Sequence, residues 1–214
     1  MLKADFHIHT KYSMDCNSSL EDIVKRCLET GISCITIADH DAIEGALNML
    51  GLAPFKVIVA EEVLTPQGEV IGMFLKDRVP SGLPIEQAIT QIKDQGGLVS
   101  LPHPFDAIRG LRIDGKRLEE LVPQVDMIEV FNARSHFINS ANKAHTFARK
   151  FELPCTAGSD AHTIDEIGET YVEMPEFNDS KDFLKSLRQG RIHRHGSRLF
   201  VHFSSLWAKI SKLL

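Results

Sequence analysis

The chain has 214 residues, of which 43% are hydrophobic and 25% are charged, and its formal net charge is -5. These values are typical of one globular domain with a substantial core, so residues 1–214 are expected to form a single domain. The acidic balance argues against a stable nucleic-acid partner, and no apolar run approaches the roughly 20 residues that span a bilayer, so no membrane partner is expected.

Short apolar runs alternate with amphipathic segments along the whole chain. The pattern predicts, in chain order, a strand (1–8), a helix (18–31), a strand (33–39), a helix (42–50), a strand (55–63) with a hairpin arm (65–75), a helix (84–97), a strand (97–104), a helix (115–124), a strand (125–132), a helix (139–153), two strands (154–160 and 168–175) and a helix (180–190). Ser18 or Ser19 is the expected N-cap of the first helix, and Gly31 is expected to end it. Pro66 and Gly68 mark the turn before the hairpin arm.

The repeated order of strand and then helix predicts an α/β fold with a parallel sheet, because each helix is the crossover that a parallel strand pair requires. About seven such units fit either a barrel or a doubly wound sheet, and the order alone does not choose between them. Residues 191–214 are expected to add a strand and an amphipathic helix to a barrel core of about residues 1–190.

Residue types that bind metals gather at the C-terminal ends of the predicted strands. Six successive strands end in "DFHIH", "IADHD", "AEEV", "LPHP", "IEVFN" and "GSDAH". In an α/β fold these ends form one rim of the sheet, where active sites are built. Eight side chains are therefore candidate ligands: His7, His9, Asp15, His40, Glu62, His103, Asp160 and His162.

Eight ligands are too many for one catalytic ion, which takes about three, and they suit two or three divalent ions that share a carboxylate such as Glu62. Imidazole and carboxylate donors without thiolate suit zinc, manganese or iron. Clustered divalent ions favour the hydrolysis of phosphate esters, because they activate water and neutralise the charge on the phosphoryl group. Arg109 and Arg134 follow two of the strand ends and are the candidate catalytic residues that would contact the phosphate.

The motifs "DFHIHTKYSMD", "IADHD", "LPHP" and "GSDAH", in this order, resemble those of the PHP (polymerase and histidinol phosphatase) family over roughly the first 175 residues. The resemblance implies a distorted (β/α)7 TIM-like barrel, a metal site at the C-terminal ends of its strands, and phosphoesterase activity. It also implies three ion positions. The first takes His7, His9, Glu62 and Asp160, the second shares Glu62 and adds His103, and the third takes Asp15, His40 and His162.

Three further positions bear on this pattern. Many relatives have histidine where this chain has Asn132, so the second ion is expected to be weakly held or to use water there. Glu129 has the opposite parity to Asn132 on its strand, and it is expected to contact a ligand rather than a metal. Glu61 is an alternative to Glu62, although the spacing of the family motif favours Glu62.

Three other functions stay open. An exonuclease-like phosphodiesterase acting on short oligonucleotides needs an open groove with basic or aromatic walls, whereas the acidic balance favours a small phosphorylated substrate. A metallo-amidohydrolase also uses His and Asp at a barrel rim, but no lysine ends a predicted strand beside the other ligands. A non-catalytic metal-binding PHP module is the third alternative, and the measured number of metal ions per chain would separate it from an enzyme.

The remaining signals carry less weight. A second H-x-H pair, at His193 and His195, is more typical of a surface strand or a basic patch than of a metal site. The four cysteines are scattered and the first residues lack a long apolar stretch, so free thiols and a cytoplasmic location are expected. The segment 204–214 is amphipathic and is expected to dock against the barrel.

Overall fold

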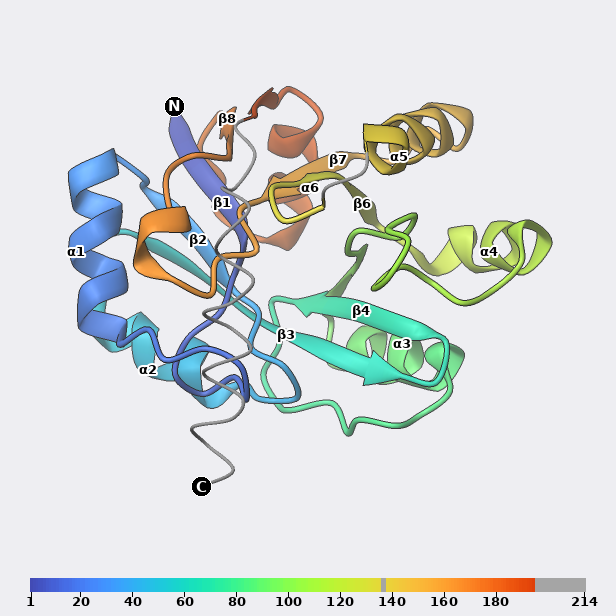
Figure 1. Ribbon diagram of the computed structural model, residues 1–214, viewed down its shortest axis with the longest axis horizontal. Helices are drawn as coiled ribbons and strands as arrows, with labels where there is room; N and C mark the ends of the chain where they lie inside the picture. The colour runs from blue at the N-terminus through green and yellow to red at the C-terminus, as the bar shows by residue number, and fades with distance from the viewer. Residues whose placement is uncertain (136–137, 195–214) are drawn as a thin grey trace.

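The computed structural model describes residues 1–135 and 138–194, and within them nine strands form one strongly curved sheet with helices outside it (Figure 1). The strands are β1 (Leu2–Ile8), β2 (Cys34–Ile37), β3 (Lys56–Thr65), β4 (Gly68–Met73), β5 (Leu98–Leu101), β6 (Met127–Asn132), β7 (Cys155–Gly158), β8 (Tyr171–Met174) and β9 (Arg191–His193). The helices are α1 (Leu20–Thr30), α2 (Glu44–Leu52), α3 (Ile85–Asp94), α4 (Gly115–Leu121), α5 (Ile138–Lys150) and α6 (Ser180–Leu187). Short 3-10 turns cover Val122–Gln124 and Ile164–Glu166.

The strand order is β7-β6-β5-β4-β3-β2-β1-β8-β9. Strands β1, β2 and β3 pair in parallel, and so do β5, β6 and β7, as the strand–helix order predicts. Strand β4 departs from that order, because it follows β3 through a tight turn and lies antiparallel to both β3 and β5. Its first residues therefore lie at the same edge of the sheet as the last residues of β3.

The sheet nearly closes into a barrel between its first strand and the segment that follows β7. Ile8 forms a parallel bridge with Ala161, and the backbone N–H of His9 donates to the carbonyl of Ala161 at 3.0 Å. Strands β8 and β9 extend the sheet beyond β1 in antiparallel pairing. The expected distorted barrel is thus confirmed, although the hairpin at β4 interrupts a regular repeat of strand and helix.

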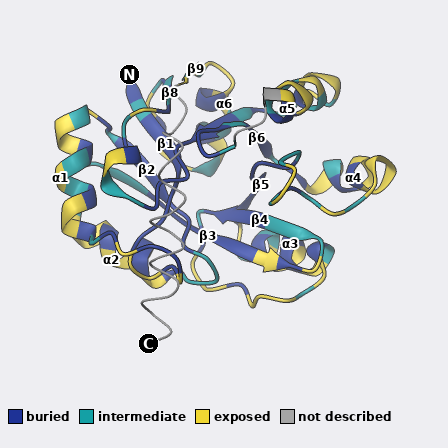
Figure 2. Ribbon diagram, viewed as in Figure 1, coloured by how far each residue is buried: buried dark blue, intermediate teal, exposed yellow. Residues whose placement is uncertain are grey.

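The helices cover the outside of this sheet and expose their outer faces, whereas the strands are largely buried (Figure 2). Helix α1 begins where Ser19 accepts a hydrogen bond from the backbone N–H of Asp22, and it ends at Gly31, whose φ of 73° suits glycine. Phe183 of α6 packs edge-on against Phe6 of β1, and both rings are buried. Within the described residues, the helices are all too short or too polar to cross a bilayer.

Candidate metal centre

The eight predicted ligands converge at one edge of the barrel, because each follows or ends a strand that reaches this edge. His7 and His9 leave β1 on one face, two residues apart, as the period of a strand requires. His103 and Asp160 adopt positive φ values of 27° and 53°, in a region that non-glycine residues seldom occupy. Such backbone conformations gather at functional sites, where surrounding structure holds them in place.

Four donor atoms form a first cluster at the end of β1. His7 Nε2 lies 3.1 Å from His9 Nε2 and 3.3 Å from Glu62 Oε2. His9 Nε2 lies 3.4 Å from Glu62 Oε2 and 3.3 Å from Asp160 Oδ1, and His7 Nε2 lies 3.8 Å from Asp160 Oδ1. A tetrahedral ion with bonds of about 2.0–2.2 Å separates its ligands by about 3.3–3.6 Å, so this spacing matches a tetrahedral metal.

A second group of donors surrounds Asp15, in the loop between β1 and α1. His162 Nε2 lies 3.3 Å from Asp15 Oδ1, and His40 Nε2 lies 3.5 Å from Asp15 Oδ2. His9 lies in the same group, so the two clusters are adjacent.

A third group of donors surrounds the other oxygen of Glu62. His103 Nε2 lies 3.2 Å from Glu62 Oε1 and 3.6 Å from Oε2 of Glu69, which the sequence analysis did not identify. Glu69 also approaches His40, whose Nδ1 lies 3.9 Å from Glu69 Oε1 and 3.3 Å from Glu62 Oε2. Glu62 therefore contributes one oxygen to each of two donor groups.

Hydrogen bonds on the far side of the rings orient three of the histidines. His9 Nδ1 lies 3.0 Å from Ser13 Oγ, and His162 Nδ1 lies 2.9 Å from the carbonyl oxygen of Asp160. His7 Nδ1 lies 3.2 Å from Glu129 Oε1. A proton on each Nδ1 leaves the lone pair of Nε2 facing the donor cluster, which is the arrangement that metal-binding histidines use.

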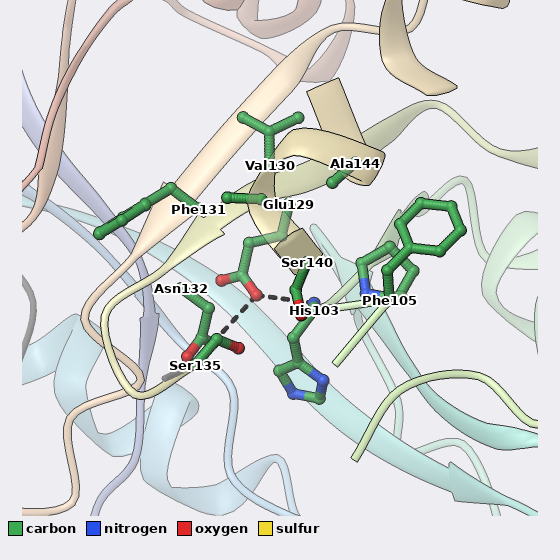
Figure 3. Close-up of a pocket in the computed structure, with 11 residues that line it drawn as sticks. His103, Phe105, Glu129, Val130, Phe131, Asn132, Ser135, Ser140 and Ala144 are labelled. Carbon is green, nitrogen blue, oxygen red and sulfur yellow. Dashed lines mark hydrogen bonds between the residues drawn. The ribbon is translucent and has the colours of Figure 1, made fainter. Parts of the chain in front are cut away.

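Glu129 contacts His7 and His103, and it also contacts Asn132, which opposite parity on β6 would place on the other face. The pairing register of β6 with β7 shifts between Glu129 and Phe131, and this shift puts Glu129 and Asn132 on one side. The Glu129 carboxylate accepts hydrogen bonds from the backbone N–H of His103 at 2.8 Å and from Asn132 Nδ2 at 3.0 Å (Figure 3). The same residues border a cavity of about 90 Å³, whose opposite wall is apolar and includes Phe105 and Ala144.

Charge and burial perturb the pKa values of His7, in β1, and His9, just after it, in opposite directions. Burial alone would lower the pKa of His7, but the carboxylates of Glu62 and Asp160 raise it well above its ordinary value. Burial and the nearby His162 lower the pKa of His9 to about 3. His9 is therefore neutral near pH 7 and keeps the lone pair that a metal requires.

The buried carboxyl groups carry more negative charge than an apolar interior tolerates without cations. Burial would raise the pKa of Asp160, but Arg109 and His7 hold it well below its usual range. Burial would likewise raise the pKa of Glu62, and its neighbours, His7 first among them, hold it well below its usual range. The pKa of Glu69 is raised by burial and by the charge of Glu62, so these two carboxylates repel each other.

Two arginines were predicted near this rim, and they occupy different environments. Arg109 binds Asp160 through Nη1 and lies 3.3 Å from Asn132 Oδ1 through Nη2, and its side chain is 30% exposed. Arg134 is buried, and its Nε lies 3.4 Å from Glu166 Oε1. Asn132 is likewise buried, and both polar atoms of its amide are hydrogen-bonded to protein groups.

Other residues from the sequence analysis lie outside the donor groups. Glu61 points away from Glu62, and its Oε2 accepts a hydrogen bond from the backbone N–H of Val79 at 2.7 Å. His193 lies in the surface strand β9 and stacks on Tyr171 of β8. His195 and the amphipathic segment 204–214 lie outside the described residues.

The donor set fits divalent cations, and two atoms give an independent reason. Within the described part of the chain, Glu62 Oε1 and Glu69 Oε2 are buried and accept no hydrogen bond. An unsatisfied buried carboxylate oxygen is costly, and a cation removes that cost. The residues present therefore match the metal site that the family resemblance implies.

Comparison with known proteins decides the family. A model described as "PHP domain" matches residues 5–122, and one described as "PHP-associated" matches residues 139–192. The chain belongs to the PHP family. Among its PHP relatives, uncharacterized protein MJ0417 of Methanocaldococcus jannaschii is 34% identical over 186 residues, which cover 84% of this chain and 73% of the relative.

Solved structures share the PHP fold of this chain. A two-domain protein from Bacteroides vulgatus, which contains a predicted PHP-like metal-dependent phosphoesterase, superposes with a TM-score of 0.75 at 17% identity, covering 97% of this chain and 69% of that one. PsfC from Pseudomonas syringae gives a TM-score of 0.68 at 16% identity, covering 100% of this chain and 99% of that one. At such identities the likeness concerns the fold alone.

Proposed function

We propose that this PHP protein is a metal-dependent hydrolase of phosphate esters, acting on a small phosphomonoester or nucleotide with two or three divalent ions of zinc, manganese or iron. The observation that carries the proposal is the adjacency of the donor groups. Glu62 belongs to two of the donor groups, and His9 also belongs to two. Ions held by these adjacent groups would therefore lie close enough together to act on one substrate. Such ions, when bound, lower the pKa of water and neutralise the charge of a transferring phosphoryl group.

The protein's own residues have two tasks in this proposal. His7, His9 and His162 present Nε2 atoms from rings that are fixed by hydrogen bonds at Nδ1, so the donor geometry exists before the substrate arrives. The second task is charge balance. Asp15, Glu62 and Asp160 are buried and ionised, and they offset the positive charge of the ions so that a phosphate dianion meets a site of moderate charge.

Arg109 is the better candidate of the two arginines for contact with the phosphate. Its guanidinium is anchored on Asp160 yet its side chain remains 30% exposed, whereas Arg134 is only 5% exposed and lies against Glu166. A guanidinium has five N–H donors, so Arg109 keeps donors for a substrate after binding Asp160 and Asn132.

The proposal is tested by hydrolysis assays on protein that has been stripped of metal and reloaded with zinc, manganese or iron. A panel of phosphomonoesters and nucleotide diesters should reveal a substrate, and His9→Ala should lower kcat/KM about 100-fold or more. His193→Ala is the matched control, because His193 lies on β9 outside the donor groups, and its rate should equal that of the wild type. Metal-loaded protein that hydrolyses nothing on the panel would refute the proposal.

A further inference from the structure

Asn132 lies beside the second ion position, where the sequence analysis expected an ion to be weakly held or to use water. In the structure, the amide of Asn132 has no lone pair left to bind a metal. Its Oδ1 accepts hydrogen bonds from Arg109 Nη2 at 3.3 Å and from the backbone N–H of Arg134 at 3.0 Å. Its Nδ2 donates to Glu129 at 3.0 Å and to Asp160 at 3.2 Å. An amide oxygen has two lone pairs and an amide nitrogen offers none, so Asn132 is fully used.

Positive charge also occupies this side of the donor groups. Arg109 extends from the segment after β5 and places its guanidinium on Asp160 and Asn132. A guanidinium remains charged at all accessible pH values and repels a second cation at short range. An ion bound by Glu62 and His103 therefore needs a further ligand other than Asn132.

Glu69 lies close to His103 and His40, and its position follows from the hairpin. Glu69 pairs with Leu64 in the antiparallel register, two residues beyond Glu62 on β3, so Glu62 and Glu69 share one face of the sheet. Because β4 runs backwards relative to its neighbours, a residue at its beginning reaches the rim that other strands reach at their ends.

The three donor atoms meet at His103. Glu62 Oε1 lies 3.2 Å and Glu69 Oε2 lies 3.6 Å from His103 Nε2. Within the described residues, both carboxylate oxygens are buried without a hydrogen bond, and the Glu62 side chain is 1% exposed. A cation between two carboxylates that repel each other would stabilise this arrangement and satisfy both oxygens.

We infer that Glu69 is a metal ligand and that, with Glu62 and His103, it forms the second ion position in place of the side chain at position 132. Three protein ligands leave open coordination positions for water and substrate, as a catalytic ion requires. Glu62 joins this position to the first cluster, because its other oxygen lies 3.3 Å from His7 Nε2. The inference rests on the proposed function only in so far as the protein binds metal.

The experiment measures metal binding rather than activity. Glu69→Gln is compared with the wild type by elemental analysis after dialysis against limiting manganese or zinc, and by calorimetric titration of the stripped protein. The variant should bind about one ion fewer per chain, or bind one ion about 10–100-fold more weakly. Glu86→Gln is the matched control, because Glu86 is exposed on α3 and pairs with Arg117, and its metal content should equal that of the wild type.

The outcomes separate this inference from the proposed function. A Glu69→Gln variant that keeps the wild-type ion count and affinities overturns the inference and leaves the phosphoesterase proposal intact. Loss of one ion in a protein that hydrolyses no phosphate ester supports the inference and removes the proposed function. Wild-type protein that binds no ion overturns both. Glu69→Asp guards against a folding defect, because it keeps the charge and should retain more metal than Glu69→Gln at equal thermal stability.

Discussion

Gly158, the last residue of β7, offers a direct test of how β1 and β7 position the metal ligands. A Cβ added to Gly158 would lie 2.4 Å from His7 Cβ and 2.8 Å from His7 N. Both atoms belong to the backbone or its first branch, so rotation of a side chain cannot relieve the contact. Carbon atoms in contact are about 3.5 Å apart, so Gly158→Ala should separate the two strands locally by about 1 Å.

Gly158→Ala should lower both the stability of the protein and its affinity for metal. Overpacking of this kind destabilises proteins by about 1–3 kcal/mol, and a domain of this size loses about 2–4 °C of Tm for each kcal/mol. A shift of about 1 Å at His7 is also half the length of a metal–nitrogen bond, so metal affinity should fall about tenfold or more. Unfolding in urea without metal gives the first quantity, and calorimetric titration of metal gives the second.

The control is a second glycine-to-alanine change in open space. A Cβ on Gly51, in helix α2, would meet no atom within 4 Å, so Gly51→Ala should stabilise the protein by about 0.5–1 kcal/mol and leave metal binding unchanged. If Gly158→Ala were as stable as the wild type and bound metal equally well, the contact between β7 and His7 would not position the ligands.

Three further outcomes are expected. Addition of metal at about 100 times its Kd should stabilise the protein by about 2.7 kcal/mol per independent site, which is seen as a rise in Tm. His7→Ala should make that rise smaller. An equal rise in the variant would contradict the assignment of His7 as a ligand. Phe183→Ala should lower the free energy of unfolding by about 3–5 kcal/mol, because Phe183 is fully buried against three other phenylalanine rings. Leu28 lies on the exposed side of α1, so Leu28→Ala should change the free energy of unfolding by no more than about 0.5 kcal/mol. Equal effects of the two substitutions would contradict the described core. Burial raises the pKa of the Cys16 thiol to about 11, so its thiolate is scarce at pH 8. A thiol reagent should therefore modify Cys16 rapidly only in denaturant. Rapid modification of the native protein would show that the loop between β1 and α1 opens.

The gathering of candidate ligands could be predicted from the sequence, because parallel strands place the side chains at their C-terminal ends along one edge of the sheet. The "H-x-H" of β1 and the "GSDAH" after β7 lie far apart in the chain, yet His9 Nε2 lies 3.3 Å from Asp160 Oδ1. The reason is topological, since parallel strands joined by helices all end at the same edge. The family resemblance supplied the grouping of ligands, which strand periodicity alone left open.

Glu69 escaped the sequence analysis for the same topological reason. Parallel strands place ligands at their C-terminal ends, whereas Glu69 lies at the beginning of β4, which runs antiparallel to its neighbours. The signal was present in the turn, because a hairpin at Pro66 and Gln67 fixes the register and puts Glu69 on the face of Glu62. Combining that register with side-chain parity would have identified Glu69.

The two arginines show what local sequence leaves undetermined. Both Arg109 and Arg134 follow strand ends by a few residues, and the sequence analysis named both as candidates for contact with the phosphate. The paths of the loops decide their surroundings: one brings Arg109 to Asp160, and the other buries Arg134 against Glu166. Loop conformation depends on tertiary packing, which periodicity does not encode.

The narrow seam between β1 and the segment after β7 bears on the order of events during synthesis. The donors of the first cluster come from β1 and the residue after it, from Glu62 on β3, and from Asp160 after β7. No ion can be held by all four until the chain has been synthesised beyond Asp160, so metal capture is a late event that joins the first and seventh strands of the barrel. Removal of the metal should then open this seam before any other part of the barrel, and exchange of backbone amide protons at Ile8 and His9 would report it.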